Sequence, residues 1–448
     1  MAHENLNTIT NSVVEFLRRQ KRGFAYIRME IDKKRWVIFV LLVLANVINY
    51  IDRQALSILA PLLHRELSLS NVDYSFVVNA FLVAYAVSYL GSGMMMDRIG
   101  GRRGVALCVA VWSIAACLHA AAVGFFSLMA FRFLLGFSES GINPGAVKIL
   151  TRMFPPRDRA FTIGMVFGGA GIGAVFAPVV VVWLLQNSNW RAAFLITGVL
   201  GFAVLAAWLV LYRPSDDEAL KNLPAFEDAA HVNAAPYRFT ELFRLRPTWI
   251  IICLHSIAGP VFFFFMFWLP NYLAQARGFS MELIGKTTWI PYLGEFLGLL
   301  VGSMTAGRLI KQGFGVLWTR KAVGLACGVI VPLSVLFALQ VTNPYQIVIL
   351  MGFAMFGIGM QISSFGPLPG DLYPYGNVAS VTGIAGLAGS IAGVVFTFLV
   401  GVLSDRGLYV IPFLIVAVAY PLAMLAFAIF LKPIPLLRSE QPVVLHPA

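Results

Sequence analysis

The sequence predicts an all-α membrane protein whose twelve transmembrane helices form two six-helix bundles. Of its 448 residues, 59% are hydrophobic and only 12% are charged, whereas soluble proteins carry about 25% charged residues. Apolar segments that are long enough to cross a bilayer recur along the whole chain. The longest polar interruption between them divides the segments into six and six, which predicts the two bundles.

The expected spans follow from these apolar segments. In the first half they are 36–63, 74–96, 104–123, 125–150, 161–186 and 190–212. In the second half they are 248–275, 284–310, 319–340, 344–367, 378–404 and 409–431. The predicted domains are therefore an N-terminal tail (1–35), a first bundle (36–212), a central loop (213–247), a second bundle (248–431) and a C-terminal tail (432–448). For the basic N-terminal tail we expect a solvated segment, with a short interfacial helix as the alternative, and no cleavable signal.

The distribution of positive charge orients the chain. Of the 33 lysines and arginines, 25 fall in the tails or in and beside the loops that follow the even-numbered spans, and only five lie at the opposite loops. This asymmetry is the positive-inside pattern, and it predicts an inner-membrane protein with both termini in the cytoplasm. The net charge of +12 therefore requires no nucleic-acid partner. Scattered histidines and cysteines without ligand spacing predict no metal and no cofactor.

The two halves share a short repeat. Residues 153–164 and 372–383 carry an aromatic–Pro pair, an alanine and a glycine at the same spacing, 219 positions apart. Two parallel halves with a binding site between them are typical of secondary transporters.

Charged residues occur inside two of the predicted spans. Asp52 and Arg53 lie near the middle of the first span, where ionised side chains are costly unless they face protein or water. In the fourth span, Arg132, Glu139 and Asn143 share one helical face. We expect this face to line a water-filled cavity that holds all four ionisable side chains, with Arg132 and Asn143 among the substrate-binding residues.

The spacing also predicts which groups pair. Arg132 and Glu139 lie about 10.5 Å apart along a straight helix, so we expect each to pair with Asp52 or Arg53 of the first span. The alternative is a buried ion-pair network that only fixes helix packing, although such networks are weak stabilisers.

The loop after the second span carries a motif. It reads Gly93-Met-Met-Met-Asp97-Arg98-Ile-Gly-Gly-Arg102-Arg103, which resembles the Gly-x-x-x-Asp-Arg-x-Gly-x-Arg-Arg signature of the major facilitator superfamily. The resemblance implies that Gly93, Asp97, Arg98 and Arg102 form a latch of the cytoplasmic gate. The alternative is a basic loop that only orients the chain.

Two further stretches resemble one family within that superfamily. They are Asn49-Tyr-Ile-Asp52-Arg53 and the segment from Arg132 through Glu139 to Pro144, and together they resemble the anion:cation symporters that carry hexuronates and galactonate. The resemblance implies that Arg53 and Tyr85 contact a sugar acid and that Asp52 and Glu139 take up protons. Glycines stand in the fifth and eleventh spans where some relatives place amides, so the exact sugar stays open.

Weaker candidates lie elsewhere in the spans. Glu295 is an acid in an apolar helix and is either a proton-coupling site or a locally hydrogen-bonded group. Gln361, Ser363 and Ser364 could bind sugar hydroxyls, or they could join helices, as small polar residues often do in membranes. Together with Tyr50, these polar groups favour a hydroxylated substrate.

A charge count links these residues to a mechanism. Asp52, Arg53, Arg132 and Glu139 sum to zero, so a bound monoanion leaves a net charge of −1 and one proton restores neutrality. The sequence therefore predicts a monomeric proton-coupled importer of a sugar-acid anion, most simply a hexuronate. The alternatives are a carrier of galactonate, glucarate or an aromatic acid, and a transporter-derived sensor. An enzyme is not expected, because the sequence has no nucleophile–base pair, metal cluster or nucleotide loop.

Overall fold

The fold was analysed in a computed structural model, which describes residues 2–154, 156–215, 237–373 and 375–431. All regular elements in these ranges are helices. Within them, twelve helical segments are long and apolar enough to cross a membrane. The predicted all-α, twelve-span class is therefore confirmed.

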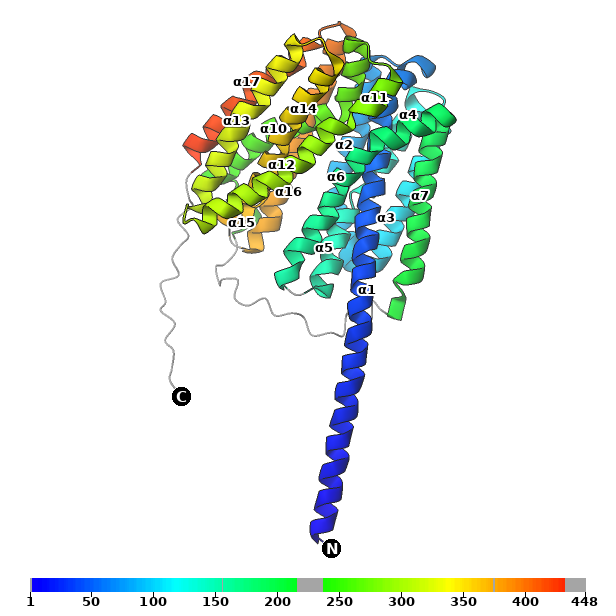
Figure 1. The fold of residues 1–448 in the computed structure, drawn as a ribbon, viewed down its shortest axis with the longest axis vertical. Helices are drawn as coiled ribbons and strands as arrows, with labels where there is room; N and C mark the ends of the chain where they lie inside the picture. The colour runs from blue at the N-terminus through cyan, green and yellow to red at the C-terminus, as the bar shows by residue number, and fades with distance from the viewer. Residues whose placement is uncertain (1, 155, 216–236, 374, 432–448) are drawn as a thin grey trace.

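The helices fall into two groups in chain order, which Figure 1 shows side by side. The first comprises α1 (Ala2–Glu66), α2 (Asn71–Ile99), α3 (Gly101–His119), α4 (Phe125–Glu139), α5 (Ile142–Met153), α6 (Pro156–Asn187) and α7 (Trp190–Leu211). The short α9 (Phe239–Leu242) precedes the second group. That group comprises α10 (Arg246–Arg277), α11 (Met281–Thr287), α12 (Trp289–Lys311), α13 (Val316–Gln340), α14 (Pro344–Phe365), α15 (Leu368–Leu372), α16 (Tyr375–Asp405) and α17 (Val410–Phe430).

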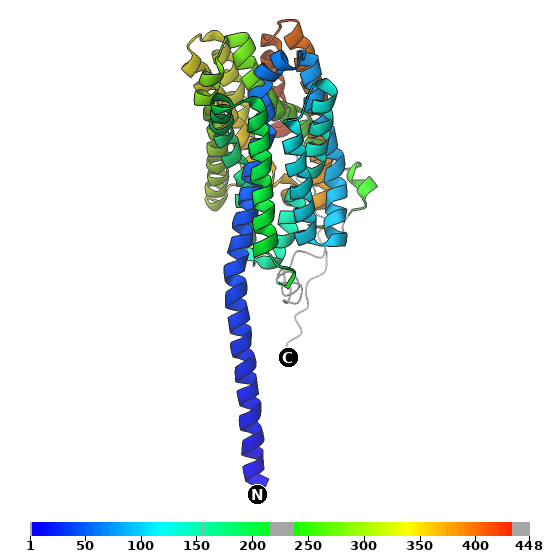
Figure 2. The same cartoon turned by 90° about the vertical axis from the view of Figure 1, so that its right-hand side faces the viewer.

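The first helix is longer than its span. Figures 1 and 2 show α1 projecting far beyond the other helices toward the N-terminus. Its backbone is helical from Ala2 to Glu66, whereas the apolar span begins at Lys34. The sequence predicted a solvated tail or a short separate helix before the span, and the structure continues one helix through both.

The fourth span is interrupted next to a key acid. The sequence predicted one helix over 125–150, but α4 ends at Glu139 and α5 begins at Ile142. Ser140 Oγ donates a hydrogen bond to the Phe137 carbonyl, which satisfies part of the broken helix end. Gly141 lies against α3, where an added Cβ would meet Cys108 Sγ at 2.4 Å. The close packing of this segment on α3 therefore needs a residue without a side chain at position 141.

Four helix pairs join the two bundles: α1 with α10, α2 with α16, α6 with α11, and α6 with α12. On α6, Gly171 faces Phe296 of α12, while Gly168 and Gly164, one and two turns earlier, meet nothing of the described chain within 4 Å. On α16, Gly401 packs against Asn71 of α2, whereas Gly383 and Gly386, on the corresponding face, likewise meet no described atom. The bundles are thus in contact at the end that holds Asn71 and separate toward the other end.

Candidate functional site

An ion pair between α1 and α4 lies at the centre of the first bundle. Arg53 donates from Nη2 and Nε to Glu139 Oε2, at 2.8 and 3.1 Å, and from Nη2 to Asn49 Oδ1 at 3.4 Å. The two side chains are buried, with 8% and 0% of their surface exposed. Such a charge-assisted pair is strong in a low-dielectric site. The expected meeting of Arg53 and Glu139 is therefore found.

Aromatic rings surround the guanidinium of Arg53. Its Cζ lies 4.6 Å from the ring centroid of Tyr50, 4.9 Å from that of Phe81 and 5.0 Å from that of Tyr85. These are cation–π distances. The rings exclude most water from the guanidinium, which stays charged. A carboxylate that binds Arg53 would therefore replace few hydrogen bonds between the arginine and water.

Small residues bring these rings to the arginine. Gly136 lets α4 approach α2 so closely that an added Cβ would lie 2.4 Å from the Phe81 carbonyl oxygen. Gly173 of α6 likewise packs on α1, where a Cβ would lie 2.3 Å from the Val47 oxygen and 2.9 Å from Tyr50 Cβ. Close backbone approach through small residues is the usual way in which helices associate within a bilayer.

Glu139 is incompletely paired. Both bonds from Arg53 end on Oε2, and Oε1 is buried without a hydrogen-bond partner among the described residues. Buried acceptors are rarely left unpaired. A carboxyl group held in this way has one oxygen available to carry a proton or to meet a ligand.

Asp52 does not join this pair. Its Oδ2 accepts a hydrogen bond from Trp112 Nε1 of α3 at 3.0 Å, and the residue is 2% exposed. In the described part of the chain, Asp52 is therefore hydrogen-bonded to α3 and not to Arg53 or Arg132. Neighbouring residues on a helix point about 100° apart, so Asp52 faces α3 when Arg53 faces Glu139 of α4.

Arg132 is also withdrawn from the expected cavity. It is fully buried, and its Nη2 donates to the backbone carbonyl of Arg53 at 2.8 Å. Its Nε and Nη1 have no hydrogen-bond partner in the described ranges. The predicted pairing of Arg132 with Asp52 is not formed, and the residue instead supports the backbone that presents Arg53.

The remaining candidates occupy different places. Asn143 lies at the start of α5, and its buried Oδ1 has no partner among the described residues. Glu295 of α12, in the second bundle, is half-buried. The next residue, Phe296, faces Gly171 of α6, so this part of α12 lies at the boundary between the bundles.

The three candidates on α14 are largely engaged within the second bundle. Gln361 Oε1 accepts a 2.6 Å hydrogen bond from Tyr420, and Ser363 Oγ donates to the Met360 carbonyl at 2.8 Å. Ser364 is fully buried, with its hydroxyl unpaired in the described part of the chain.

The motif after α2 is described only in part. The surroundings of Gly93 and the side chain of Asp97 lie outside what the structure describes. Arg98 is exposed, and Arg102 donates from Nε to the carbonyl of Tyr212 at the end of α7. Arg102 thus closes a helix end within its own bundle.

A second cluster, which the sequence did not predict, joins the two bundles at one end. Asp405, the last residue of α16, accepts from the backbone N–H groups of Asn71 and Val72 at 2.7 and 3.0 Å. Asn271 of α10 donates to Asn71 Oδ1 at 2.9 Å, and Tyr74 donates to the carbonyl of Phe267 at 2.7 Å. A carboxylate at the first N–H groups of a helix is favoured by both hydrogen bonding and the helix dipole.

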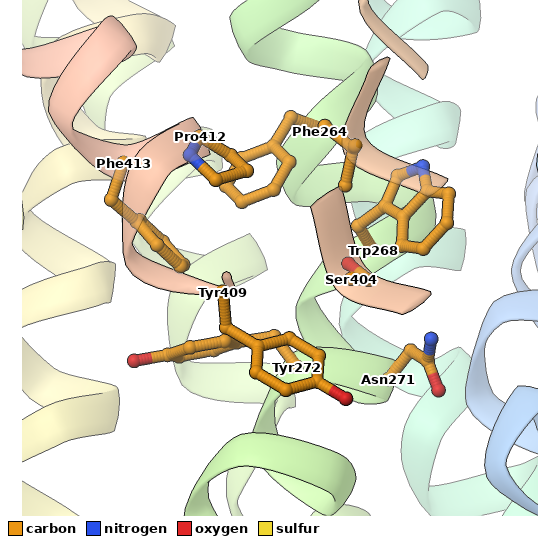
Figure 3. A pocket seen from close by; sticks show the side chains of 9 residues that line it. Phe264, Trp268, Asn271, Tyr272, Ser404, Tyr409, Pro412 and Phe413 are labelled. Carbon is orange, nitrogen blue, oxygen red and sulfur yellow. The ribbon is translucent and has the colours of Figure 1, made fainter. Parts of the chain in front are cut away.

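Asn271 lies at the edge of a group of aromatic side chains, which Figure 3 shows. Together they line a small pocket formed by Phe264, Trp268, Asn271, Tyr272, Val400, Ser404, Tyr409, Pro412 and Phe413. The second-bundle half of the junction therefore borders an apolar pocket.

Comparisons with known proteins agree with this architecture. The family model of the Major Facilitator Superfamily matches residues 42–295. The chain is 28% identical over 381 residues to the hexuronate transporter of Escherichia coli (strain K12), covering 83% of this chain and 88% of that one. It is 30% identical over 328 residues to the probable L-galactonate transporter of the same strain, covering 71% and 72%.

A solved structure has the same fold. The inward-facing, occupied form of a bacterial homolog of the human lysosomal transporter Spinster aligns with a TM-score of 0.71 at 17% identity, covering 88% of this chain and 96% of that one. The match of the family model over more than half of the chain, together with the twelve spans, establishes that this multi-pass membrane protein belongs to the Major Facilitator Superfamily, a family of transporters rather than enzymes.

Proposed function

We propose that the protein is a proton-coupled symporter that imports a sugar-acid anion, most simply a hexuronate, by alternating access. The observation that carries this proposal is the buried pair of Arg53 and Glu139, whose second carboxyl oxygen is unpaired. Arginine is always charged and can hold a substrate carboxylate in two parallel hydrogen bonds. The hexuronate and probable L-galactonate transporters among its relatives support the substrate class.

Proton uptake and substrate binding are coupled because Glu139 and the substrate carboxylate compete for Arg53. When Glu139 takes a proton, it loses its attraction for the guanidinium, and the substrate carboxylate replaces it. Tyr50 and Tyr85, which already contact Arg53, offer hydroxyl groups to the sugar. One proton and one monoanion leave the charge of the cluster unchanged, so the loaded site can close without burying a net charge.

The other candidate residues have graded roles in this proposal. Glu295, on α12 of the second bundle, is a second proton-accepting group. Asn143, with an unpaired buried oxygen, contacts the substrate. Asp52 and Arg132 hold α1, α3 and α4 in position. Gln361, Ser363 and Ser364 of α14 affect substrate binding only indirectly, through the packing of the second bundle.

The proposal includes an orientation of the carrier in the membrane and a division of the chain into two halves. The carrier is a monomer in the inner membrane, with both termini in the cytoplasm and the two halves bounded at 36–212 and 248–431. In this orientation, the end at which Asp405 joins the bundles is external, and the separated end opens to the cytoplasm. The latch proposed for the loop from Gly93 to Arg102 would act when that cytoplasmic end closes.

Uptake into proteoliposomes tests the function. Labelled glucuronate, galacturonate, galactonate and an aromatic acid are supplied with and without an inwardly directed proton gradient. We expect gradient-driven accumulation of a hexuronate, and Glu139→Gln should abolish it while anion exchange survives. Glu282→Gln is the matched control, because that exposed carboxylate pairs only with Lys286 among described residues.

The outcome separates the candidate substrates. Preference for galactonate would identify the protein as a galactonate carrier, the alternative that the similarity to the probable L-galactonate transporter supports. Full accumulation by the Glu139→Gln variant would refute the coupling mechanism, and the absence of any anion uptake would refute transport of this class.

A further inference from the structure

An apolar groove separates α10 and α17 on the outer side of the second bundle. It has a volume of about 320 Å³, which falls within the range of small-molecule sites. Its floor is formed by the buried residues Leu254, Ala423 and Phe427, and its rims by the exposed rings of Trp249 and Phe430. The groove is thus a recess in the surface that these membrane-spanning helices present to lipid.

The shape of the groove fits a hydrocarbon chain. On the α17 side it is lined by the small residues Ala423 and Ala426, which leave room between the two helices. On the α10 side the lining extends from Arg246 to Ile257, about 16 Å along the helix axis. A chain that runs beside these residues would enter the hydrocarbon layer from the level of the head groups.

A single charged side chain closes one end. Among the described residues, Arg246 is the only charged one that lines the groove, and its Cζ lies 6.0 Å from the ring centroid of Phe430. Within the described ranges it has no hydrogen bond or ion pair. Between residues 237 and 250 the chain has three arginines and one acid, and that acid, Glu241, accepts from the backbone N–H of Arg238. The guanidinium is therefore available to an anion.

The rim beside Arg246 is fixed in place. Trp249 Nε1 donates to the carbonyl of Phe243 at 2.8 Å, and the rings of the two residues lie edge to face at 6.2 Å. Tryptophan at a helix end is typical of the interface between hydrocarbon and head groups. This places Arg246 at the level at which a lipid phosphate would lie.

We propose that this groove binds an anionic phospholipid, with one acyl chain between α10 and α17 and its phosphate against Arg246. The apolar lining and the open side exclude a soluble ligand, and the unpaired arginine selects an anionic head group over a zwitterionic one. Binding would bridge the two helices that line the groove, independently of the substrate site.

Native mass spectrometry of the full-length protein, released from nanodiscs of equimolar phosphatidylglycerol and phosphatidylcholine, tests the charge selection. We expect retained phosphatidylglycerol to exceed phosphatidylcholine in the wild type. Arg246→Gln should lower that ratio about fivefold, the value for one surface cation. Arg244→Gln is the matched control, since Arg244 does not line the groove.

A second variant tests the acyl chain separately. Ala426→Phe should fill the groove and reduce retention of both lipids, whereas Leu422→Phe, at an exposed position outside the groove, should not. Thermal unfolding verifies that each variant is folded. Equal lipid ratios in the wild type and the Arg246 variant, or equal losses in the two arginine variants, would overturn the proposal, as would unchanged retention in the Ala426 variant.

Discussion

The junction at Asp405 makes a quantitative prediction about the equilibrium between the two open states. Asp405→Asn removes the negative charge and one of the two acceptors that meet the N-terminus of α2. Hydrogen bonds to charged groups contribute roughly 1.5–3 kcal/mol each when buried, and the outer of these two bonds is exposed to solvent. We therefore assign about 2 kcal/mol to the carboxylate, including its interaction with the helix dipole.

The hydrogen bonds of Asp405 form only in the state in which the bundles are joined at that end, so removing them destabilises that state alone. Replacing the whole carboxylate, as in Asp405→Ala, should raise the ratio of separated to joined molecules about 30-fold, and Asp405→Asn, which keeps one acceptor, about fivefold. Asn271 and Tyr74 still join the bundles in both variants, so the protein should stay folded and active.

Double electron–electron resonance measures the shift. Spin labels at Val123 and Tyr345, which are exposed loop or helix-end positions on different bundles, report the separation of this end. Asp73→Asn is the matched control, because Asp73 caps the same helix through Ser70 without touching the other bundle. Unchanged distance distributions in the Asp405 variants, or equal shifts in the Asp73 variant, would refute the reasoning.

Three further predictions concern the first bundle. Arg53→Lys should raise the KM for uptake more than tenfold, because lysine keeps the charge but not the planar pair of donors. Trp112→Phe should lower the free energy of unfolding by about 1–3 kcal/mol, since Asp52 then lacks its hydrogen-bond donor; a thermal melt measures this. Gly173→Val should prevent folding, whereas Gly168→Val, where nothing described lies within 4 Å, should be expressed normally.

Each of these expectations can fail. An unchanged KM in the lysine variant would mean that the guanidinium does not hold the substrate. A phenylalanine variant as stable as the wild type would mean that water or another group satisfies the aspartate. Equal expression of the two valine variants would contradict the close contact of α6 with α1.

The sequence predicted the spans and the central ion pair because both depend on local patterns. Apolar length alone identifies a helix that crosses lipid, and charges in such helices must find each other or water. Arg53 and Glu139 satisfy that requirement together. The placement of Asp52 could also have been foreseen, since adjacent helical residues cannot point in the same direction.

Other features depend on contacts that no local pattern contains. Trp112 is one of several tryptophans in apolar helices, and nothing in its neighbourhood marks it as the partner of Asp52. The junction of Asp405 with Asn71 joins residues 334 positions apart, and it exists only when the bundles are close at that end. The close contact of Gly141 with α3 likewise depends on how the helices pack, which hydropathy does not report.

The contact of α12 with α14 has a mechanical consequence. An added Cβ at Gly294 would lie 2.2 Å from the Gly352 carbonyl oxygen, and one at Gly359 would lie 2.1 Å from the Glu295 carbonyl oxygen. With no side chain between the two backbones at these points, no rotamer change can adjust their spacing. A movement of the α12 backbone at Glu295 must therefore carry α14 with it, and the distance between backbone probes on these two helices should stay constant through the whole transport cycle.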